Sequence, residues 1–150
     1  MTSTTEDAAV PSQGGAPGTT DLAAMIREGY AAFARGDLDA IRQDMAADCR
    51  WHLTGGDNPF TGTYTGWGEI VGMLGRLLEL TGGTWRSELD EVVADADGRR
   101  AAAFVTATST VKGSTLVARQ VVAYFARDGQ ITDVYFQNDD ADAMDAHLSR

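Results

Sequence analysis

The segment from Phe104 to Gln137 most constrains the fold of this chain, because it predicts three long strands joined by two tight turns. Each turn contains a glycine, which adopts the positive backbone angle of a short hairpin at little cost. Alternate residues form one side that could line a cavity: Phe104, Thr106, Val117, Arg119, Val121, Val134, Phe136 and Asn138. A guanidinium that turns inward needs a carboxylate, a carbonyl or water as its partner. Arg119 in this apolar wall therefore predicts a ligand.

The rest of the chain places helices before the run of strands. In the first expected helix, Leu22, Ile26, Tyr30 and Phe33 recur at helical spacing, and Gly36 ends it. Helices first and antiparallel strands afterwards indicate an α+β fold, in which a curved antiparallel sheet wraps around helices to form a cone-shaped pocket. We expect helices over residues 21–35, 37–45, 68–80 and 140–148, and strands over 49–53, 85–93, 100–111, 114–126 and 130–137.

Length and charge limit the possible partners. A chain of 150 residues forms one domain, and its net charge of -10 disfavours nucleic acid and anionic membranes. One cysteine, Cys49, and two distant histidines make no metal set, so we expect neither metal nor cofactor. Residues 1–20 are rich in small and polar residues, which predicts a disordered tail before a domain over 21–150. They resemble no secretion signal, and we expect a soluble, cytoplasmic protein.

Several segments resemble a known superfamily. YAAFARGDLDAI, AADCRWHLTGG, NPFTGTYTGWGEIVGML and RDGQITDVYFQND together resemble the SnoaL-like branch of the nuclear transport factor 2-like superfamily. That superfamily includes polyketide cyclases, ketosteroid isomerases and limonene-type epoxide hydrolases. The resemblance covers residue 21 to the C-terminus and implies a cystatin-like α+β barrel. Because fold does not fix function, the activity depends on which pocket residues are present.

The resemblance does not carry the relatives' acids and bases onto this chain. The aspartate base of ketosteroid isomerases falls on Leu53, their oxyanion-binding acid falls on Val121, and their tyrosine falls one residue before Tyr30. The histidine and aspartate of SnoaL-type cyclases fall on Val134 and Phe136. Limonene-type hydrolases need an aspartate two residues after the arginine, where Arg119 is followed by Val121. None of these three mechanisms is therefore expected to operate unchanged.

Three side chains remain as catalytic candidates. Arg119 would hold a carbonyl or enolate oxygen, while Tyr30 or His52 would exchange a proton. Each has a structural alternative: Arg119 pairs with Glu88 or Asp90, Tyr30 is an ordinary core residue, and His52 lies on the sheet face opposite Trp51 and Leu53. The predicted substrate-binding residues are Trp51, Leu53, Phe104, Thr106, Val121, Val134, Phe136 and Asn138.

These residues predict a hydrophobic small-molecule ligand. The first hypothesis is an enzyme that promotes cyclisation or isomerisation of an oxygenated polyketide- or terpenoid-like substrate, without a cofactor. The alternative is a non-catalytic binding module of the same fold. The second sheet face is also too apolar for a free surface, which predicts a homodimer formed by sheet-on-sheet packing. Its expected members are Val105, Ala107, Ala118, Val122 and Tyr135, with Gln120 and His52 among them.

Overall fold

The computed structural model describes residues 21–150, so the predicted tail lies outside the described residues. Helices precede and flank a six-stranded sheet, which has one strand more than the sequence predicts. In chain order the elements are α2 (Leu22–Ala34), α3 (Leu38–Gln43), β2 (Met45–Leu53), β3 (Gly62–Thr65), α4 (Gly66–Leu80), β4 (Arg86–Ala94), β5 (Arg100–Val111), β6 (Ser114–Arg127), β7 (Gln130–Asn138) and α5 (Ala141–Leu148).

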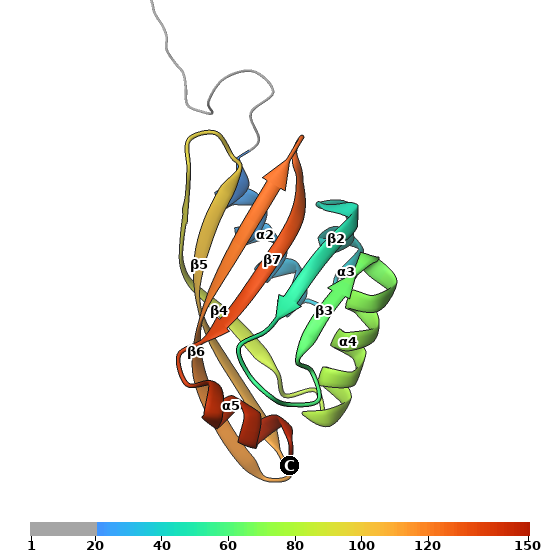
Figure 1. The fold of residues 1–150 in the computed structure, drawn as a ribbon, viewed down its shortest axis with the longest axis vertical. Helices are drawn as coiled ribbons and strands as arrows, with labels where there is room; N and C mark the ends of the chain where they lie inside the picture. Colours follow the sequence, from blue (N-terminus) through green and yellow to red (C-terminus); the bar gives the residue numbers. More distant parts are fainter. Residues whose placement is uncertain (1–20) are drawn as a thin grey trace, which may run out of the picture.

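The strand order β3-β2-β7-β6-β5-β4 confirms the α+β fold with a curved, unclosed sheet. Figure 1 shows α2 behind the sheet, α4 beside β2 and β3, and α5 at one end of the long strands β5 and β6. The strands pair antiparallel, as expected, except for β2 and β7, which run parallel with Trp51 opposite Val134. This pairing joins the first and last strands of the described residues, which are the second and third strands across the sheet.

The junction after α3 also differs from the prediction. The helical pattern extends to Met45, but α3 ends at Gln43 and Met45 begins β2. The backbone carbonyl of Asp44 accepts a hydrogen bond from Ile131 of β7, at 2.8 Å, so the chain already joins the sheet here. Tertiary pairing therefore overrides the local helical periodicity. The short strand β3, in the predicted glycine-rich loop, escaped prediction for the same reason, since its partner is β2.

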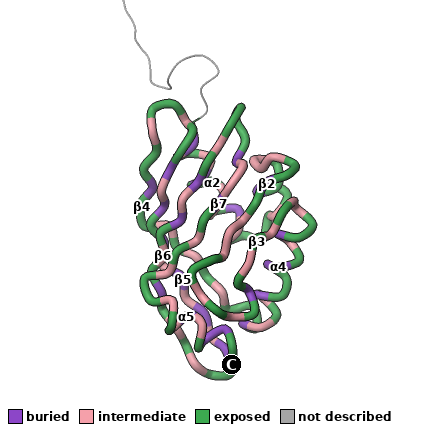
Figure 2. Tube along the Cα trace, in the orientation of Figure 1, coloured by how far each residue is buried: buried purple, intermediate pink, exposed green. Residues whose placement is uncertain are grey.

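The core lies between the helices and one face of the sheet. Leu22 and Ile26 of α2 pack with buried residues of β5 and β6, including Val105 and Val122. A second cluster gathers around Ile70 of α4 and extends to α5. In Figure 2 the buried segments run along the strands, while the strand tips and outer turns are exposed. Burial of these apolar side chains is the main stabilising contribution.

The strand register corrects which residues face the helices. Val122 lies opposite Phe136 and Tyr124 lies opposite Val134, so these four residues share one face. Val122 is fully buried, whereas Val121 is 44% exposed. The inner face of β6 therefore carries Gln120, Val122 and Tyr124. The predicted wall mixed the two faces: Phe104, Thr106, Val117, Arg119 and Val121 lie on the outer face, opposite to Val134 and Phe136.

The physical reason is that β6 is apolar on both faces, so alternation alone cannot say which set turns inward. The predicted dimer face was wrong for the same reason, because Val105, Ala107, Ala118 and Val122 are buried. Tyr135 and His52 do lie on the outer face. Within residues 21–150, no helix combines the length and the apolar composition needed to cross a membrane.

Candidate functional site

A cavity of about 130 Å³ lies between α2, α4 and the inner face of the sheet. Most of its wall is aliphatic or aromatic, which is typical of a site for a hydrophobic small molecule. The apolar lining consists of Met25, Ile26, Phe33, Ile41, Met45, Trp51, Leu53, Met73, Leu74, Leu77, Trp85, Ile131 and Phe136. Gly29, Tyr30, Asp44, Ser87, Gln120 and Tyr124 complete it.

Two tyrosine hydroxyls meet at this wall. Tyr124 of β6 donates a hydrogen bond to the hydroxyl of Tyr30 of α2, at 3.0 Å. Burial raises the pKa of Tyr30 to about 12, although the hydrogen bond with Tyr124 lowers it, and burial also raises the pKa of Tyr124. Both hydroxyls therefore stay protonated at neutral pH and act as donors, not bases. Because Tyr124 donates to Tyr30, the hydroxyl proton of Tyr30 can be donated to a third group. A hydroxyl that accepts a hydrogen bond is itself a stronger donor, so Tyr124 strengthens the bond that Tyr30 can donate.

Asp44 is the one carboxylate among the described residues that line this cavity. It caps the C-terminal end of α3, directly before β2. Burial raises its pKa above the ordinary value of 3.8, and the negative charge of Glu28 raises it further. A carboxylate with a raised pKa is a stronger base and is easier to protonate reversibly. Asp44 is therefore chemically suited to move a proton at the cavity wall.

A smaller cavity of about 70 Å³ adjoins the first. Leu53, Trp85, Gln120 and Phe136 line both cavities and therefore stand where the two adjoin. The loop over residues 54–61 and helix α5 form the other walls of the smaller cavity. Its polar side chains include Asn138, the predicted binding residue at the end of β7. The site thus has an apolar body and a more polar annex.

The structure brings only part of the predicted site together. Tyr30, Trp51, Leu53 and Phe136 line the main cavity, and Val134 is buried behind its wall. Trp51 and Phe136 contact each other, with ring centroids 5.3 Å apart. Phe104, Thr106, Arg119 and Val121 are outside, on the other face of the sheet.

Arg119 does not occupy the position expected of a ligand-binding arginine. It is exposed, and it forms no ion pair with Glu88, Asp90 or any other acid within residues 21–150. The carboxylate of Asp90 instead accepts a hydrogen bond from Thr106, at 2.7 Å. Arg119 therefore lies outside the main cavity, and the expected pairing with Glu88 or Asp90 is absent.

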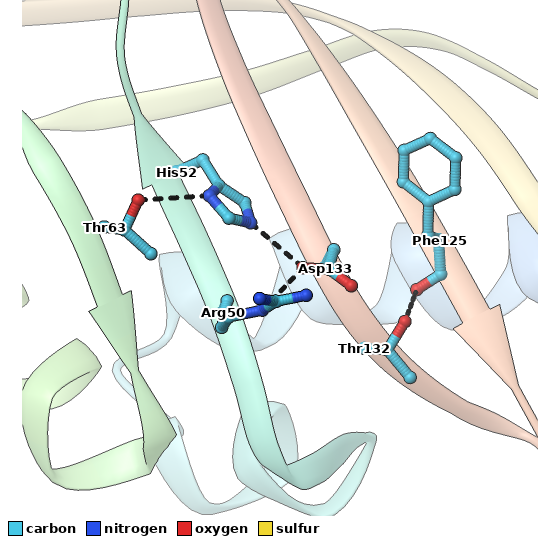
Figure 3. Close-up of polar contacts among 6 residues, drawn as sticks. All are labelled: Arg50, His52, Thr63, Phe125, Thr132 and Asp133. Carbon is cyan, nitrogen blue, oxygen red and sulfur yellow. Dashed lines mark hydrogen bonds and ion pairs between the residues drawn. The ribbon is translucent and has the colours of Figure 1, made fainter.

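His52 also lies on the outer face, as strand alternation predicts from Trp51 and Leu53. Figure 3 shows its ring between Thr63 and Asp133, with α2 behind the strands. The two ring nitrogens lie 3.1 Å from the Thr63 hydroxyl and 3.0 Å from Asp133, and the ring stacks on Tyr135. Arg50 completes the cluster through Asp133, at 3.0 Å. Burial of Asp133 opposes its ionisation, but hydrogen bonds from His52 and Arg50 lower its pKa overall. This cluster fastens β2, β3 and β7 together outside the cavity.

Cys49 does not add a reactive thiol to the site. The thiol is 1% exposed, and burial raises its pKa to about 12, so it stays protonated at neutral pH. The charges of Asp133 and Asp48 raise this pKa further and the neighbouring Trp51 lowers it, while the indole N–H of Trp51 is buried without a hydrogen-bond partner among the described residues. An inert thiol beside an indole is part of the core, not of a catalytic centre.

Sequence reasoning missed Asp44, Gln120 and Tyr124. Asp44 stood at an unrecognised helix–strand junction, where no periodicity singled it out. Gln120 and Tyr124 alternate with Val122, so the correct phase of β6 would have found both. The missing signal was the pairing with β7, which decides the phase and depends on contacts distant in the sequence.

Comparison with known proteins identifies the family of this chain. Residues 26–134 match the SnoaL-like domain family. The chain belongs to the SnoaL-like family. An uncharacterized relative of this SnoaL-like protein, Rv0034 of Mycobacterium tuberculosis, is 30% identical over 108 residues, which are 72% of this chain and 81% of the relative. The predicted family and its nuclear transport factor 2-like fold are thereby confirmed.

Solved structures agree with the SnoaL-like fold. Bal32a, from a soil-derived mobile gene cassette, is 28% identical with a TM-score of 0.80, covering 85% of this chain and 95% of that one. TerC, co-crystallized with polyporic acid, is 26% identical with a TM-score of 0.74, covering 86% and 98%. A putative polyketide cyclase of Xanthomonas campestris is 24% identical with a TM-score of 0.69, covering 85% and 96%, and supports the fold alone.

Proposed function

We propose that this SnoaL-like protein encloses a hydrophobic, oxygenated molecule of polyketide or terpenoid kind and promotes its isomerisation or cyclisation. The observation that carries the proposal is the Tyr30–Tyr124 hydroxyl pair in a mostly apolar cavity, whose other polar side chains are Asp44, Ser87 and Gln120. Hydroxyl donors in a dry site stabilise negative charge on oxygen far better than water-exposed donors do. TerC, with its polyporic acid, supports a small organic ligand for this fold.

The proposed chemistry is proton transfer next to a carbonyl group. Tyr30 donates a hydrogen bond to the carbonyl oxygen of the substrate, and the Asp44 carboxylate removes a proton from the adjacent carbon. The electron pair of that C–H bond moves into the enolate, whose oxygen keeps the Tyr30 hydrogen bond. In isomerisation, Asp44 returns the proton to another carbon. In cyclisation, the enolate carbon attacks a second carbonyl of the substrate, and the new alkoxide takes the proton from Asp44.

Deuterium exchange into a model ketone tests this chemistry. We suggest 2-tetralone in D2O, with deuterium uptake at the carbon between the ring and the carbonyl followed by proton NMR. Wild-type protein should accelerate uptake over buffer. Asp44→Asn should abolish the acceleration, because the amide cannot accept the proton, and Tyr30→Phe should lower it by about 10²-fold. Asp48→Asn, an exposed aspartate of β2 outside the cavity, is the matched control. Uptake unchanged in Asp44→Asn would disprove the assigned base.

A non-catalytic binding module is the second candidate, and one observation favours it. Leu53 and Phe136 line the cavity at positions where relatives place an acid or a base, which leaves the wall more apolar. A binder would take up 2-tetralone, seen as quenching of Trp51 and Trp85 fluorescence, without accelerating exchange. Binding with exchange favours the enzyme. If neither binding nor exchange occurs with this or related bicyclic ketones, the hydrophobic cavity is not a ligand site.

We also propose that two copies pack through the outer face of the sheet. Six large apolar side chains on or beside this face are between 37% and 63% exposed: Val93, Phe104, Val117, Val121, Phe125 and Tyr135. Exposed apolar surface of this kind is unfavourable in water and is typical of an interface. This is the reverse of the face that the sequence predicted, with the same sheet-on-sheet geometry. The cavity and this face lie on opposite sides of the sheet.

A further inference from the structure

The smaller cavity differs from the main one in its chemistry. Backbone and side chains of the loop over residues 54–61, the end of β7 and helix α5 surround about 70 Å³ of space. Its polar side chains are Thr54, Asn58, Thr61, Gln120, Gln137, Asn138 and Asp145. Because Gln120 belongs to both cavities, a molecule that fills the main cavity can reach this polar annex at Gln120.

An amide pair stands where the two cavities meet. The side-chain nitrogen of Gln120 donates to the side-chain oxygen of Asn138, at 2.9 Å. This bond holds both amides in one orientation and uses one group of each. The Gln120 carbonyl and the Asn138 N–H₂ then keep hydrogen-bonding capacity, since neither has a partner within residues 21–150. A fixed acceptor and a fixed donor side by side match a hydroxyl or an amide, which both donates and accepts.

The one charged side chain of the annex is already satisfied. Asp145 accepts from the backbone N–H of Asp57 at 2.8 Å and from the side-chain amide of Asn58 at 2.7 Å. Each carboxylate oxygen therefore has a protein donor, and Asp145 does not call for a cationic ligand. Its negative charge disfavours an anionic one. The annex is consequently suited to a neutral polar group.

The distance between the two polar regions constrains the ligand. Gln120 and Tyr124 lie on the same face of β6, four residues apart. A strand rises about 3.3 Å per residue, so their backbones are separated by about 13 Å. Val122, Phe136 and Leu53, which lie opposite one another on neighbouring strands, form apolar wall or core between them. Two polar regions separated by an apolar stretch match a molecule of two or three rings with an oxygen at each end.

We propose that Gln120 and Asn138 form a terminal subsite that selects elongated ligands carrying a neutral hydroxyl or amide at the end opposite the Tyr30 carbonyl site. The subsite rests on the proposed function, because the ring system of the ligand occupies the main cavity. It narrows the substrate class from any hydrophobic oxygenated molecule to one with two oxygens at its ends. Carboxylated analogues are rejected by Asp145.

Flavone and 4′-hydroxyflavone form the test pair, since they share a flat ring system with a ketone and differ by one terminal hydroxyl. Titration followed by tryptophan fluorescence should show about three- to tenfold tighter binding of 4′-hydroxyflavone to the wild type, the usual effect of one added hydrogen bond. Gln120→Met keeps the side-chain length but removes the amide, so it should equalise the two affinities. Gln43→Met, at an exposed glutamine of α3 that lines neither cavity, should keep the preference.

A measurement without any variant guards against misfolding of Gln120→Met. In nitrogen-15 NMR spectra, 4′-hydroxyflavone should shift the side-chain amide signals of Gln120 and Asn138, and flavone should not. Equal binding of both flavones to the wild type, or a preference that survives in Gln120→Met, overturns the subsite while leaving the cavity proposal intact. Failure of both flavones to bind contradicts the cavity proposal itself. The two failures are thus distinguishable.

Discussion

Asp145 of α5 accepts a hydrogen bond from the side-chain amide of Asn58, at 2.7 Å, and thereby ties the C-terminal helix to the loop beside the smaller cavity. A second bond, from the backbone N–H of Asp57, fixes the same carboxylate. The side-chain oxygen of Asn58 also accepts a hydrogen bond from the backbone N–H of Phe60, whose side chain is buried. Asn58 therefore connects the loop both to α5 and to the core. The wall of the annex therefore depends on one carboxylate distant in the sequence.

Asp145→Ala should loosen this loop without unfolding the protein. Two hydrogen bonds to the loop are lost, so amide hydrogen exchange over residues 54–61 should become faster while exchange in β5 and β6 stays unchanged. Asp142→Ala, an exposed residue of the same helix, provides the control. Exchange in the loop that matches the wild type would show that Asp145 does not hold it.

A side chain at Gly56 should push the Asp145 carboxylate away from the loop. A Cβ atom there would lie 2.6 Å from a carboxylate oxygen of Asp145, closer than real Cβ contacts allow. Gly56→Ala should therefore give the same faster loop exchange as Asp145→Ala. Gly72→Ala is the matched comparison, because Gly72 is an exposed residue inside α4 with open space around its Cα. It should raise the free energy of unfolding by about 0.5–1 kcal/mol, measured by urea denaturation.

The sequence predicted the order of elements and the family, because these depend on local periodicity, turn residues and short motifs. It did not predict the inner face of β6, since Val121 and Val122 are equally apolar and only pairing with Phe136 distinguishes them. Because the predicted phase of β6 was off by one residue, the prediction placed Arg119 in the site, whereas the structure places Gln120 there. Tyr30, Trp51 and Leu53 do line the main cavity, because their helix and strand have one clearly apolar face each. Asp44 and Asp145 act through contacts that no local pattern encodes.

The attachment of α5 should depend on pH through His147. This histidine is 3% exposed and lies 2.9 Å from the hydroxyl of Ser109 on β5. Burial lowers its pKa below 6.5, and Arg150 lowers it further. The folded state therefore favours the neutral ring, so the stabilisation is fully present above pH 6.5 and is lost as the pH falls towards the lowered value.

Urea denaturation between pH 7.5 and 5.5 measures this effect. The free energy of unfolding should fall with pH in the wild type, and His147→Gln should show a flatter dependence because its amide does not titrate. His52→Gln is the control, since it removes the other histidine while leaving α5 untouched. An equally steep fall in His147→Gln would assign the pH dependence to other groups.

The proposed dimer gives the last prediction. Val121 lies in the outer face of the sheet, next to Phe104 on β5, and is 44% exposed. Val121→Glu places a charge among apolar side chains, and a charge buried in an interface without a partner is strongly unfavourable. Light scattering coupled to gel filtration should show a dimer for the wild type and a monomer for Val121→Glu. Ala31→Glu, on the exposed side of α2, adds the same charge away from this face and should remain dimeric.

A wild-type monomer at micromolar concentration, or a Val121→Glu dimer as stable as the wild type, would contradict packing through this face. Because Val121 points away from the cavity, the variant should still bind flavone, which separates assembly from ligand binding.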